Sequence, residues 1–347
     1  AYAVIGSVRG GLASATVIGC GGFAALSGSS VASALTMGKV ALSEMDRYKY
    51  DPRLSTGVVA AGGTLGILIP PSTGFVIYAI LTEQSIGRLF LAGVFPGILL
   101  LSLFVLAVTA ICWIRPGYGP AGPRTTFAHK LRAVAGAGPI AGVIIVTIGG
   151  IYGGFFSPVE AAAVGAGIVI LIGAVTGKLG LAALWAAAKD SVVTTATVML
   201  ILIAATFLSF VMTSVGIGRQ VTSLITESGL SPLETLWLIV GVYLVLGMFM
   251  ESLSMMIATV PIVTPVVVQL GYDPVWFGVL MMLLLETALI TPPVGFNLFI
   301  VQGVRSRGQI KDVMIGSAPF VVTLLLMIAL LIWFPNLALW LPHQLRG

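Results

Sequence analysis

Two double-proline breaks interrupt long apolar stretches of this chain, one at Pro70-Pro71 and one at Pro292-Pro293. Proline lacks a backbone N–H and clashes with the preceding helical turn, so each pair should end a helix. A broken helix leaves amides and carbonyls unpaired, which a membrane tolerates only where these groups line a cavity or bind a ligand. Two such breaks in corresponding parts of a chain are typical of the binding site of a secondary transporter.

The composition places the chain in a membrane. It is 58% hydrophobic and 8% charged, with a mean hydropathy of +1.10, which excludes an ordinary soluble domain. Several apolar runs reach the roughly 20 residues that a helix needs to cross a bilayer. We therefore predict an all-α polytopic membrane protein. Because the sequence begins at Ala1, we also expect a further N-terminal region before it.

An internal duplication relates the two breaks. Shifting the sequence by 222 residues brings one double proline onto the other, and a shift of one residue more brings Pro96 onto Pro319. Several spaced matches at one offset indicate a duplicated unit of about 100 residues. The other matches at the first offset are Ser30 with Ser252 and Tyr50-Asp51-Pro52 with Tyr272-Asp273-Pro274.

Each copy is expected to hold a reentrant hairpin, a proline-broken helix and a full span, and the two copies should have inverted orientations. The first copy, 1–114, contains the hairpin 9–46, the broken helix 54–80 and the helix 89–114. The second copy, 232–347, contains the hairpin 232–270, the broken helix 274–303 and the helix 313–340. Between them we predict a cytoplasmic loop at 115–136, then scaffold helices and connecting arms over 137–231, with spans at about 137–153, 157–177 and 191–214 and arms at 178–190 and 216–230.

The basic residues support this topology. If the first hairpin opens to the cytoplasm and the second to the opposite side, fourteen of the 17 lysines and arginines lie on the cytoplasmic side, as the positive-inside rule requires. The outer side then keeps Arg88, Arg219 and Arg346. The cytoplasmic set is Arg9, Lys39, Arg47, Lys49, Arg53, Arg115, Arg124, Lys130, Arg132, Lys178, Lys189, Arg305, Arg307 and Lys311.

The hairpin tips and the breaks are expected to meet near the middle of the membrane and to form the binding site. Helix N-termini there suit a carboxylate, while unwound carbonyls and hydroxyls suit a hard cation such as sodium. The first-copy candidates are Ser27, Gly28, Ser29, Ser30, Gly63, Thr64, Gly66, Pro70, Pro71 and Ser72. The second-copy candidates are Glu251, Ser252, Ser254, Glu286, Thr291, Pro292, Pro293, Gly295 and Asn297.

Two sodium sites, one in each copy, are predicted within this set. The predicted sodium ligands are Ser27, Ser29, Ser30, Thr64 and Gly66 in the first copy and Ser252, Ser254 and Thr291 in the second. The alternative is that serine and glycine only allow helices to pack closely in lipid.

Glu251 and Glu286 are the acidic residues predicted to lie deepest in the membrane. Carboxylates at such depth coordinate ions, relay protons, or accept hydrogen bonds from neighbouring helix ends. An intramembrane protease is the competing class of function. It is disfavoured because the two Tyr-Asp pairs fall on opposite faces and because His129 and His343 lie outside the predicted spans, which leaves a serine without a base.

Five segments together resemble the large membrane subunit of TRAP (tripartite ATP-independent periplasmic) transporters, over essentially the whole chain. They are Gly22-Phe-Ala-Ala-Leu-Ser27-Gly-Ser-Ser30, Leu68-Ile-Pro-Pro-Ser72, Ser85-Ile-Gly-Arg-Leu-Phe-Leu-Ala-Gly93, Gly154-Phe-Phe-Ser-Pro-Val-Glu160-Ala-Ala-Ala-Val-Gly165 and Ile290-Thr-Pro-Pro-Val-Gly-Phe-Asn297.

The resemblance implies a sodium-driven symporter for organic acids in the inner membrane of a bacterium or archaeon, working by an elevator movement. It implies two protein partners, a periplasmic substrate-binding protein and a small four-helix membrane subunit, and no cofactor beyond the coupling sodium ions. The alternative within the same superfamily is a stand-alone sodium- or proton-coupled carboxylate transporter.

Overall fold

The computed structural model describes residues 5–122, 135–136, 138–216, 220, 223, 229–305 and 307–344. Those residues form helices and connecting turns, with no strand among them. Five of the helices in the described residues are long and apolar enough to cross a membrane, or six if one bent pair is counted as a span. The helices are α2 (Gly11–Ser27), α3 (Ser30–Arg47), α4 (Pro52–Leu68), α5 (Thr73–Thr82), α6 (Ile86–Ile114), α8 (Gly138–Tyr152), α9 (Pro158–Val175), α10 (Leu181–Val215), α12 (Pro232–Leu246), α13 (Ser252–Gln269), α14 (Pro274–Ile290), α15 (Phe296–Val304), α16 (Ile310–Trp333) and α17 (Asn336–Gln344).

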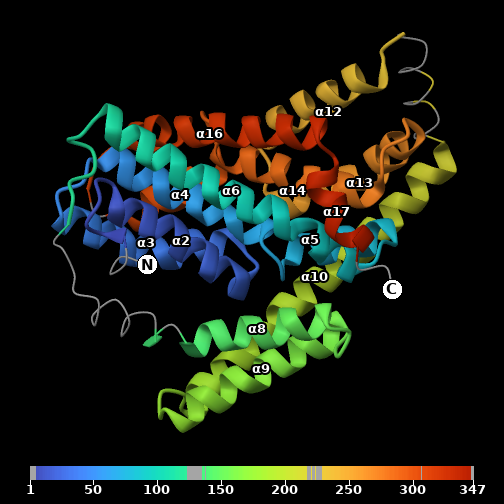
Figure 1. Ribbon diagram of the computed structural model, residues 1–347. Coiled ribbons are helices and arrows are strands. Elements are labelled where there is room, and N and C mark those ends of the chain that lie inside the picture. The colour runs from blue at the N-terminus through green and yellow to red at the C-terminus, as the bar shows by residue number, and fades with distance from the viewer. Residues whose placement is uncertain are drawn as a thin grey trace.

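The first hairpin consists of α2 and α3, which fold back at a two-residue tip. Gly28 adopts a left-handed conformation (φ 58°, ψ 15°) that ends α2, and only glycine does so without steric cost. Ser29 then begins α3, because its side chain accepts a hydrogen bond from the amide of Ala32 at 3.4 Å. Both open ends of this hairpin lie at the same end of the molecule, on the left in Figure 1.

The two proline-broken helices begin in the same way. Asp51 caps α4 by accepting from the amide of Arg53 at 2.8 Å, and Asp273 caps α14 by accepting from the amide of Val275 at 2.7 Å. In both, proline occupies the first helical turn, where its missing N–H costs nothing. The helices end at Leu68 and Ile290, directly before the predicted breaks, and both Pro-Pro bonds are cis.

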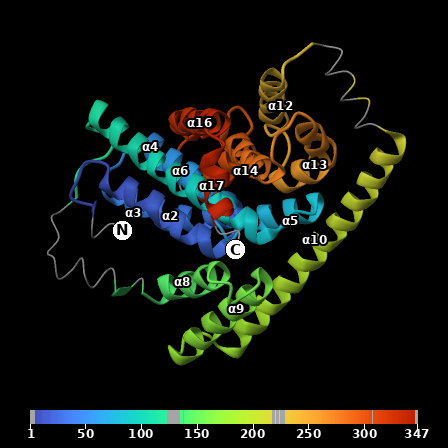
Figure 2. The same ribbon diagram turned by 45° about the vertical axis from the view of Figure 1, so that its right-hand side comes forward.

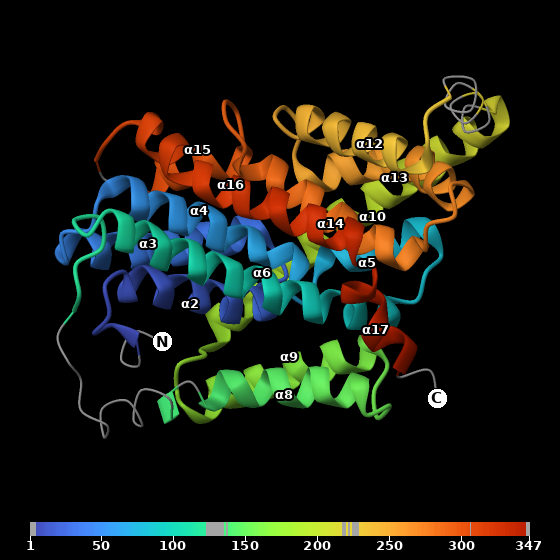
Figure 3. The same ribbon diagram turned by 45° about the horizontal axis from the view of Figure 1, so that its top comes forward.

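The two broken helices run antiparallel, side by side. The start of α14 lies beside α5, where the Tyr78 hydroxyl donates to the carbonyl of Pro274 at 2.7 Å. Farther along α14, Glu286 accepts from the amide of Leu68 at the end of α4. The second hairpin, α12 and α13, accordingly opens toward the opposite end of the molecule from the first (Figure 3). A hydrogen bond of 2.5 Å from Tyr243 to Thr259 joins its two arms.

Helices α4 and α14 form the centre of this body, and nearly all of their side chains are buried. Helix α16 crosses α4 with almost no side chain between them. A Cβ on Gly57 would lie 2.1 Å from the carbonyl oxygen of Gly316, and a Cβ on Gly316 would lie 1.9 Å from that of Arg53. Because no other residue fits such a crossing, these glycines fix how the two copies pack together.

Helices α8 and α9 lie apart from this body, as Figure 2 shows, whereas α10 packs against α13 and buries Leu202 and Ala205 there. Helix α9 begins with a capping box, in which Ser157 and Glu160 bond to each other's backbone amide. Glu160 is thus a helix N-terminal carboxylate. Helix α10 is a single helix of 35 residues, so the predicted arm 178–190 and the predicted span 191–214 are not separate. The helix continues because residues 181–215 contain no proline or glycine that would interrupt it.

A second correction concerns the last predicted span, 313–340. Helix α16 ends at Trp333, and the separate helix α17 follows, because Pro335 cannot continue the preceding helix. Several predictions lie outside the described residues. They are most of the loop 115–136 and of the arm 216–230, and the positions of Arg124, His129, Lys130, Arg132, Arg219 and Arg346.

Candidate functional site

The tip of the first hairpin lies directly on the break between α4 and α5. The Thr73 hydroxyl donates to the carbonyl of Gly28 at 2.7 Å, and the Thr73 amide lies 3.4 Å from the same oxygen. A Cβ on Gly28 would be 3.1 Å from the carbonyl oxygen of Pro71, so backbone packs on backbone here. The structure therefore brings together Gly28, Pro71 and Ser72, which were predicted from two separate segments.

A second set of contacts joins the same tip to α4. The Ser30 hydroxyl lies 3.4 Å from the carbonyl oxygen of Thr64. A Cβ on Gly66 would lie 2.6 Å from the carbonyl carbon and oxygen of Ser29, which is closer than any real side chain permits. Gly63 makes a similar close approach to Ala34 on α3. The glycines of α4 thus let the backbone of the tip approach the backbone of the broken helix.

Oxygen atoms concentrate where these segments meet. The Ser27 hydroxyl lies 2.9 Å from that of Ser33 and 3.4 Å from the carbonyl oxygen of Ser29. The Thr64 hydroxyl instead donates to Ala61 in its own helix, at 2.7 Å. Its carbonyl, rather than its hydroxyl, therefore faces the tip. Ser72 donates to the carbonyl of Ile67 across the break.

In the second hairpin the tip comprises residues 247–251, and Glu251 caps α13. Its carboxylate accepts from the amides of Leu253 and Ser254 at 2.9 and 3.1 Å. Of the three interpretations open for this carboxylate, the structure shows the hydrogen-bond acceptor at a helix end. Ser252 is 1% exposed, whereas Ser254 is exposed to the surroundings. The tip packs on α14 through Gly247, where a Cβ would lie 1.9 Å from that of Ala288.

The second break lies between α14 and α15. The Thr291 hydroxyl donates to the carbonyl of Thr287 at 2.5 Å, and the Gly295 amide donates to the carbonyl of Thr291 at 3.2 Å. Asn297 in the first turn of α15 is fully buried. Among the described residues, no hydrogen bond joins Ser252 or Ser254 to Thr291, so the second predicted cluster is less closely assembled than the first.

Glu286 joins the two copies. Its side chain is fully buried, and one carboxylate oxygen accepts from the Leu68 amide at 3.1 Å. That amide belongs to the last turn of α4, next to the first break. Glu286 also stands 222 residues after Thr64, at the same position in the repeat. A carboxylate of the second copy therefore stabilises the helix end of the first.

Several buried polar atoms of the second cluster have no hydrogen-bond partner. They are the Ser252 hydroxyl, the second carboxylate oxygen of Glu286, and both amide atoms of Asn297. Buried polar groups of native proteins are nearly always paired, so an unpaired group indicates a ligand, an ion or a water molecule. All three residues belong to the predicted binding set.

Three residues that make contacts in the candidate site were not predicted from the sequence. Thr73 supplies both donors to Gly28, Ser33 pairs with Ser27, and the Leu68 amide binds Glu286. The positions of Thr73 and Ser33, directly beside Ser72 and one turn after Ser30, are the available sequence signals. The Leu68 contact has no such signal, because it depends on how the copies pack.

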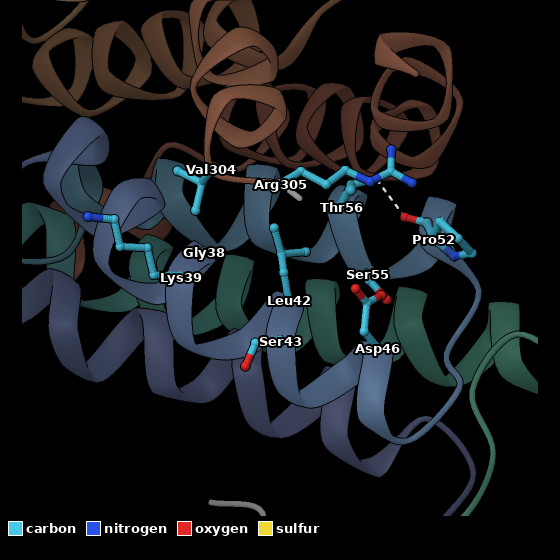
Figure 4. Close-up of a pocket in the computed structure, with 10 residues that line it drawn as sticks. All are labelled: Gly38, Lys39, Leu42, Ser43, Asp46, Pro52, Ser55, Thr56, Val304 and Arg305. Carbon is cyan, nitrogen blue, oxygen red and sulfur yellow. Dashed lines mark hydrogen bonds between the residues drawn. The ribbon is translucent and has the colours of Figure 1, made fainter. Parts of the chain in front are cut away.

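A cavity of about 130 Å³ lies away from this site, at the open end of the first hairpin. Figure 4 shows Arg305 of the second copy above Thr56 and Pro52 of the first, and the Thr56 hydroxyl donates to the Pro52 carbonyl at 2.7 Å. None of the predicted binding residues lines this cavity, which therefore does not belong to the candidate site.

Comparison with known proteins agrees with this architecture. The family model described as "Tripartite ATP-independent periplasmic transporter, DctM component" matches residues 1–337. The C4-dicarboxylate TRAP transporter large permease protein DctM of Pseudomonas aeruginosa is 36% identical over 99% of this chain and 80% of its own length.

Two further relatives differ in the substrate that they are named for. The ectoine TRAP transporter large permease protein TeaC of Halomonas elongata is 32% identical, over 98% of this chain and 79% of its own length. The sialic acid TRAP transporter large permease protein SiaM of Vibrio cholerae is 32% identical, over 100% and 81%. These relatives are permease subunits rather than enzymes. The chain belongs to the family of large permease subunits of TRAP transporters, and it is a multi-pass membrane transport protein.

Proposed function

We propose that this chain carries out sodium-coupled uptake of an organic acid by an elevator movement. The observation that supports this most strongly is the first hairpin tip seated on the first proline break. There, hydroxyl and carbonyl oxygens from two separate segments converge inside an apolar body. A dehydrated sodium ion needs several oxygens at once, and an interrupted helix supplies them at a depth where no others are available.

The first proposed sodium site uses the hydroxyls of Ser27 and Ser30 with backbone oxygens of Ser29, Thr64 and Gly66. Its support is the 3.4 Å contact of Ser30 with the Thr64 carbonyl and the close approach of Gly66 to Ser29. An ion held between tip and break would favour the closed hairpin. Binding of sodium would in this way be linked to closure over the substrate.

The second proposed sodium site uses Ser252, Ser254 and Thr291. Its support is the buried Ser252 hydroxyl without a partner and the unwound backbone after Thr291. The tip reaches α14 at Ala288, close to Thr291 in the chain. A small closing movement of the second hairpin would complete this site.

The organic acid is proposed to bind between the two breaks. Helices α5 and α15 begin at the breaks, and no side chain caps their first amides, which suits a carboxylate. The buried, unpaired side-chain amide of Asn297 is a further donor beside the second break. Two of the relatives are named for C4-dicarboxylates and for sialic acid, which supports an acidic substrate. Glu286 would then position α4 through Leu68, and proton coupling through Glu286 or Glu251 is the rival proposal.

For the elevator movement, the transport domain would comprise 1–114 and 232–347, and the scaffold would lie within 137–231. Support comes from the groove of about 620 Å³ that separates the first hairpin and break from α8, α9 and α10. Leu26 and Pro71 line one side of it, and small apolar residues of α9 and α10 line the other. Apolar walls of this kind form no directional bonds that would hold the two parts in a single register.

The proposed partners are a periplasmic substrate-binding protein and a small four-helix membrane subunit, and the proposed location is the inner membrane. Membership of the TRAP family supports these partners over the stand-alone alternative. The substrate-binding protein would select the organic acid, since similar permeases are named for unlike substrates.

Hydrogen exchange tests the first sodium site. The purified chain is compared in sodium and in potassium at equal ionic strength. If the ion bridges tip and break, amides of residues 28–33 and 64–73 exchange about tenfold more slowly at a sodium concentration ten times the dissociation constant. Ser30→Ala should reduce this protection, and Gly22→Ala, on an open face of α2, should keep it. Equal exchange in the two salts would refute the site.

A cross-link tests the elevator. Leu26 on the hairpin and Ser191 on α10 both line the groove, so a cysteine at each position can be joined by a reducible linker. We expect the linked protein to lose uptake and to regain it on reduction. Full uptake by protein that is verified as cross-linked would rule the movement out.

A further inference from the structure

A second groove lies on the outer surface of the central body, between the last turns of α6 and the first half of α16. Its volume is about 510 Å³, and none of its lining residues belongs to α8, α9 or α10. Its walls are almost entirely apolar, and several of their side chains are exposed: Ile114 is 72% exposed and Val322 66%. The lining residues of these walls are Ile111, Ile114, Ile315, Ala318, Pro319 and Val322.

One end of the groove is basic. Arg53 at the start of α4 and Arg115 at the end of α6 both line it, together with Tyr118. The Arg115 guanidinium donates to the Tyr118 hydroxyl at 2.6 Å and lies 5.2 Å from the centre of its ring. The amide of Asp51 donates to the Tyr118 carbonyl at 3.0 Å, which attaches this turn to the start of α4. Two arginines from distant segments are thus held at one end of an apolar channel.

The neighbouring acidic charge does not neutralise this end. Asp312 lies 3.9 Å from Arg53, but it also pairs with Arg305 at 3.1 Å. One carboxylate therefore serves two arginines, while Arg115 is bonded to a neutral tyrosine. With the Asp51 carboxylate that caps α4 included, three arginines face two carboxylates here, so the arginine end carries one excess positive charge, and it lies at the helix ends that the positive-inside rule assigns to the cytoplasm.

We propose that this groove binds an anionic phospholipid. The phosphate lies between Arg53 and Arg115, with the Tyr118 hydroxyl as a further donor, and one acyl chain follows the apolar wall toward Val322. Basic pockets between membrane helices on the cytoplasmic side have the chemistry that recognises anionic headgroups. A free phosphate would leave the apolar wall uncovered, and a zwitterionic lipid would carry no net charge to pair with the arginines.

A lipid in this groove would affect how the two copies pack together. The groove runs along the crossing of α4 and α16, where Gly57 of the first copy touches Gly316 of the second. A lipid bound there contacts both copies at the point where they pack most closely. It therefore stabilises their junction at the membrane surface.

Native mass spectrometry of the full purified chain tests this assignment. The probes are dioleoylphosphatidylglycerol, dioleoylphosphatidylcholine and glycerol phosphate. We expect the anionic lipid to bind more tightly than the zwitterionic one, and Arg53→Gln with Arg115→Gln to weaken it about 25-fold, since a basic residue at the surface contributes about fivefold. Arg47→Gln, which removes an exposed charge outside the groove, is the matched control.

Ala318→Phe provides an independent variant, because Ala318 is exposed on the groove wall and a larger side chain fills the channel without changing charge. It should also weaken binding of the anionic lipid. The proposal is wrong if this variant and the double arginine variant bind that lipid as the parent does. It is equally wrong if the two lipids bind alike, or if glycerol phosphate displaces the anionic lipid at equal concentration, which would indicate a soluble anion site. If the double variant does not fold, Ala318→Phe decides alone.

Discussion

Gly66→Ala is the substitution that most sharply tests the contact between the first tip and the first break. The added Cβ would lie 2.6 Å from the carbonyl carbon and oxygen of Ser29 and 2.9 Å from the amide of Ser30. Ordinary contact begins at 3.4 Å, so the tip must retreat by about 0.8 Å. All three opposing atoms are backbone, so no side-chain rotation can relieve the contact.

The expected size of the effect follows from this strain. Inserting a methyl group into a filled space costs about 1–3 kcal/mol. If that cost falls on the closed arrangement of tip and break, the sodium concentration for half-maximal uptake rises about 5- to 150-fold. Substrate capture by the periplasmic binding protein should not change, because that protein is separate.

The assay is uptake into proteoliposomes over a series of sodium concentrations, with thermal unfolding of the same preparations. Gly22→Ala is the matched control. It adds a methyl group to the middle of α2, where nothing lies within 4 Å, and it should leave the sodium dependence unchanged. Parent-like sodium dependence in folded Gly66→Ala would show that sodium coupling does not need the close contact between the tip and α4, and this would contradict the first sodium site.

Three further outcomes are expected. Ser30→Ala and Thr291→Ala should each weaken the sodium dependence of uptake while lowering stability by less than about 1 kcal/mol, since each removes a single hydroxyl. Glu286→Gln keeps an acceptor for Leu68 and should fold normally, whereas Glu286→Ala leaves that amide unpaired and should cost about 1–3 kcal/mol in thermal unfolding. A cysteine placed within 47–53 should react with an impermeant reagent only from the cytoplasmic side, and labelling only from outside would invert the proposed topology.

The positions of the helix breaks could be predicted from the sequence because they are local. Pro70 and Pro292 cannot continue a helix, Asp51 and Asp273 cap the helix that follows each, and Gly28 suits a left-handed turn. Each of these depends on the residue itself and its neighbours in the chain. The contact between the tip of the first hairpin and the first break was also predictable, because both segments belong to one copy and both carry small and hydroxyl-bearing residues.

What could not be predicted depends on packing between the copies. The bond from Leu68 to Glu286 spans 218 residues, and nothing local to either residue indicates it. The long helix α10 was divided wrongly because polarity changes along it, although no residue there breaks a helix. Polarity reflects the environment of a helix rather than the position of its ends. The change in side-chain polarity near residue 190 therefore did not mark the end of a helix.

Sodium coupling is the central claim, and uptake under separately imposed gradients tests it most directly. The chain is reconstituted with the small membrane subunit, the loaded periplasmic binding protein is added outside, and the sodium and pH gradients are set independently. The account predicts that an inward sodium gradient drives accumulation at equal pH and that a proton gradient without sodium does not. Accumulation that follows the proton gradient and ignores sodium would contradict it and would favour Glu286 or Glu251 as a proton carrier.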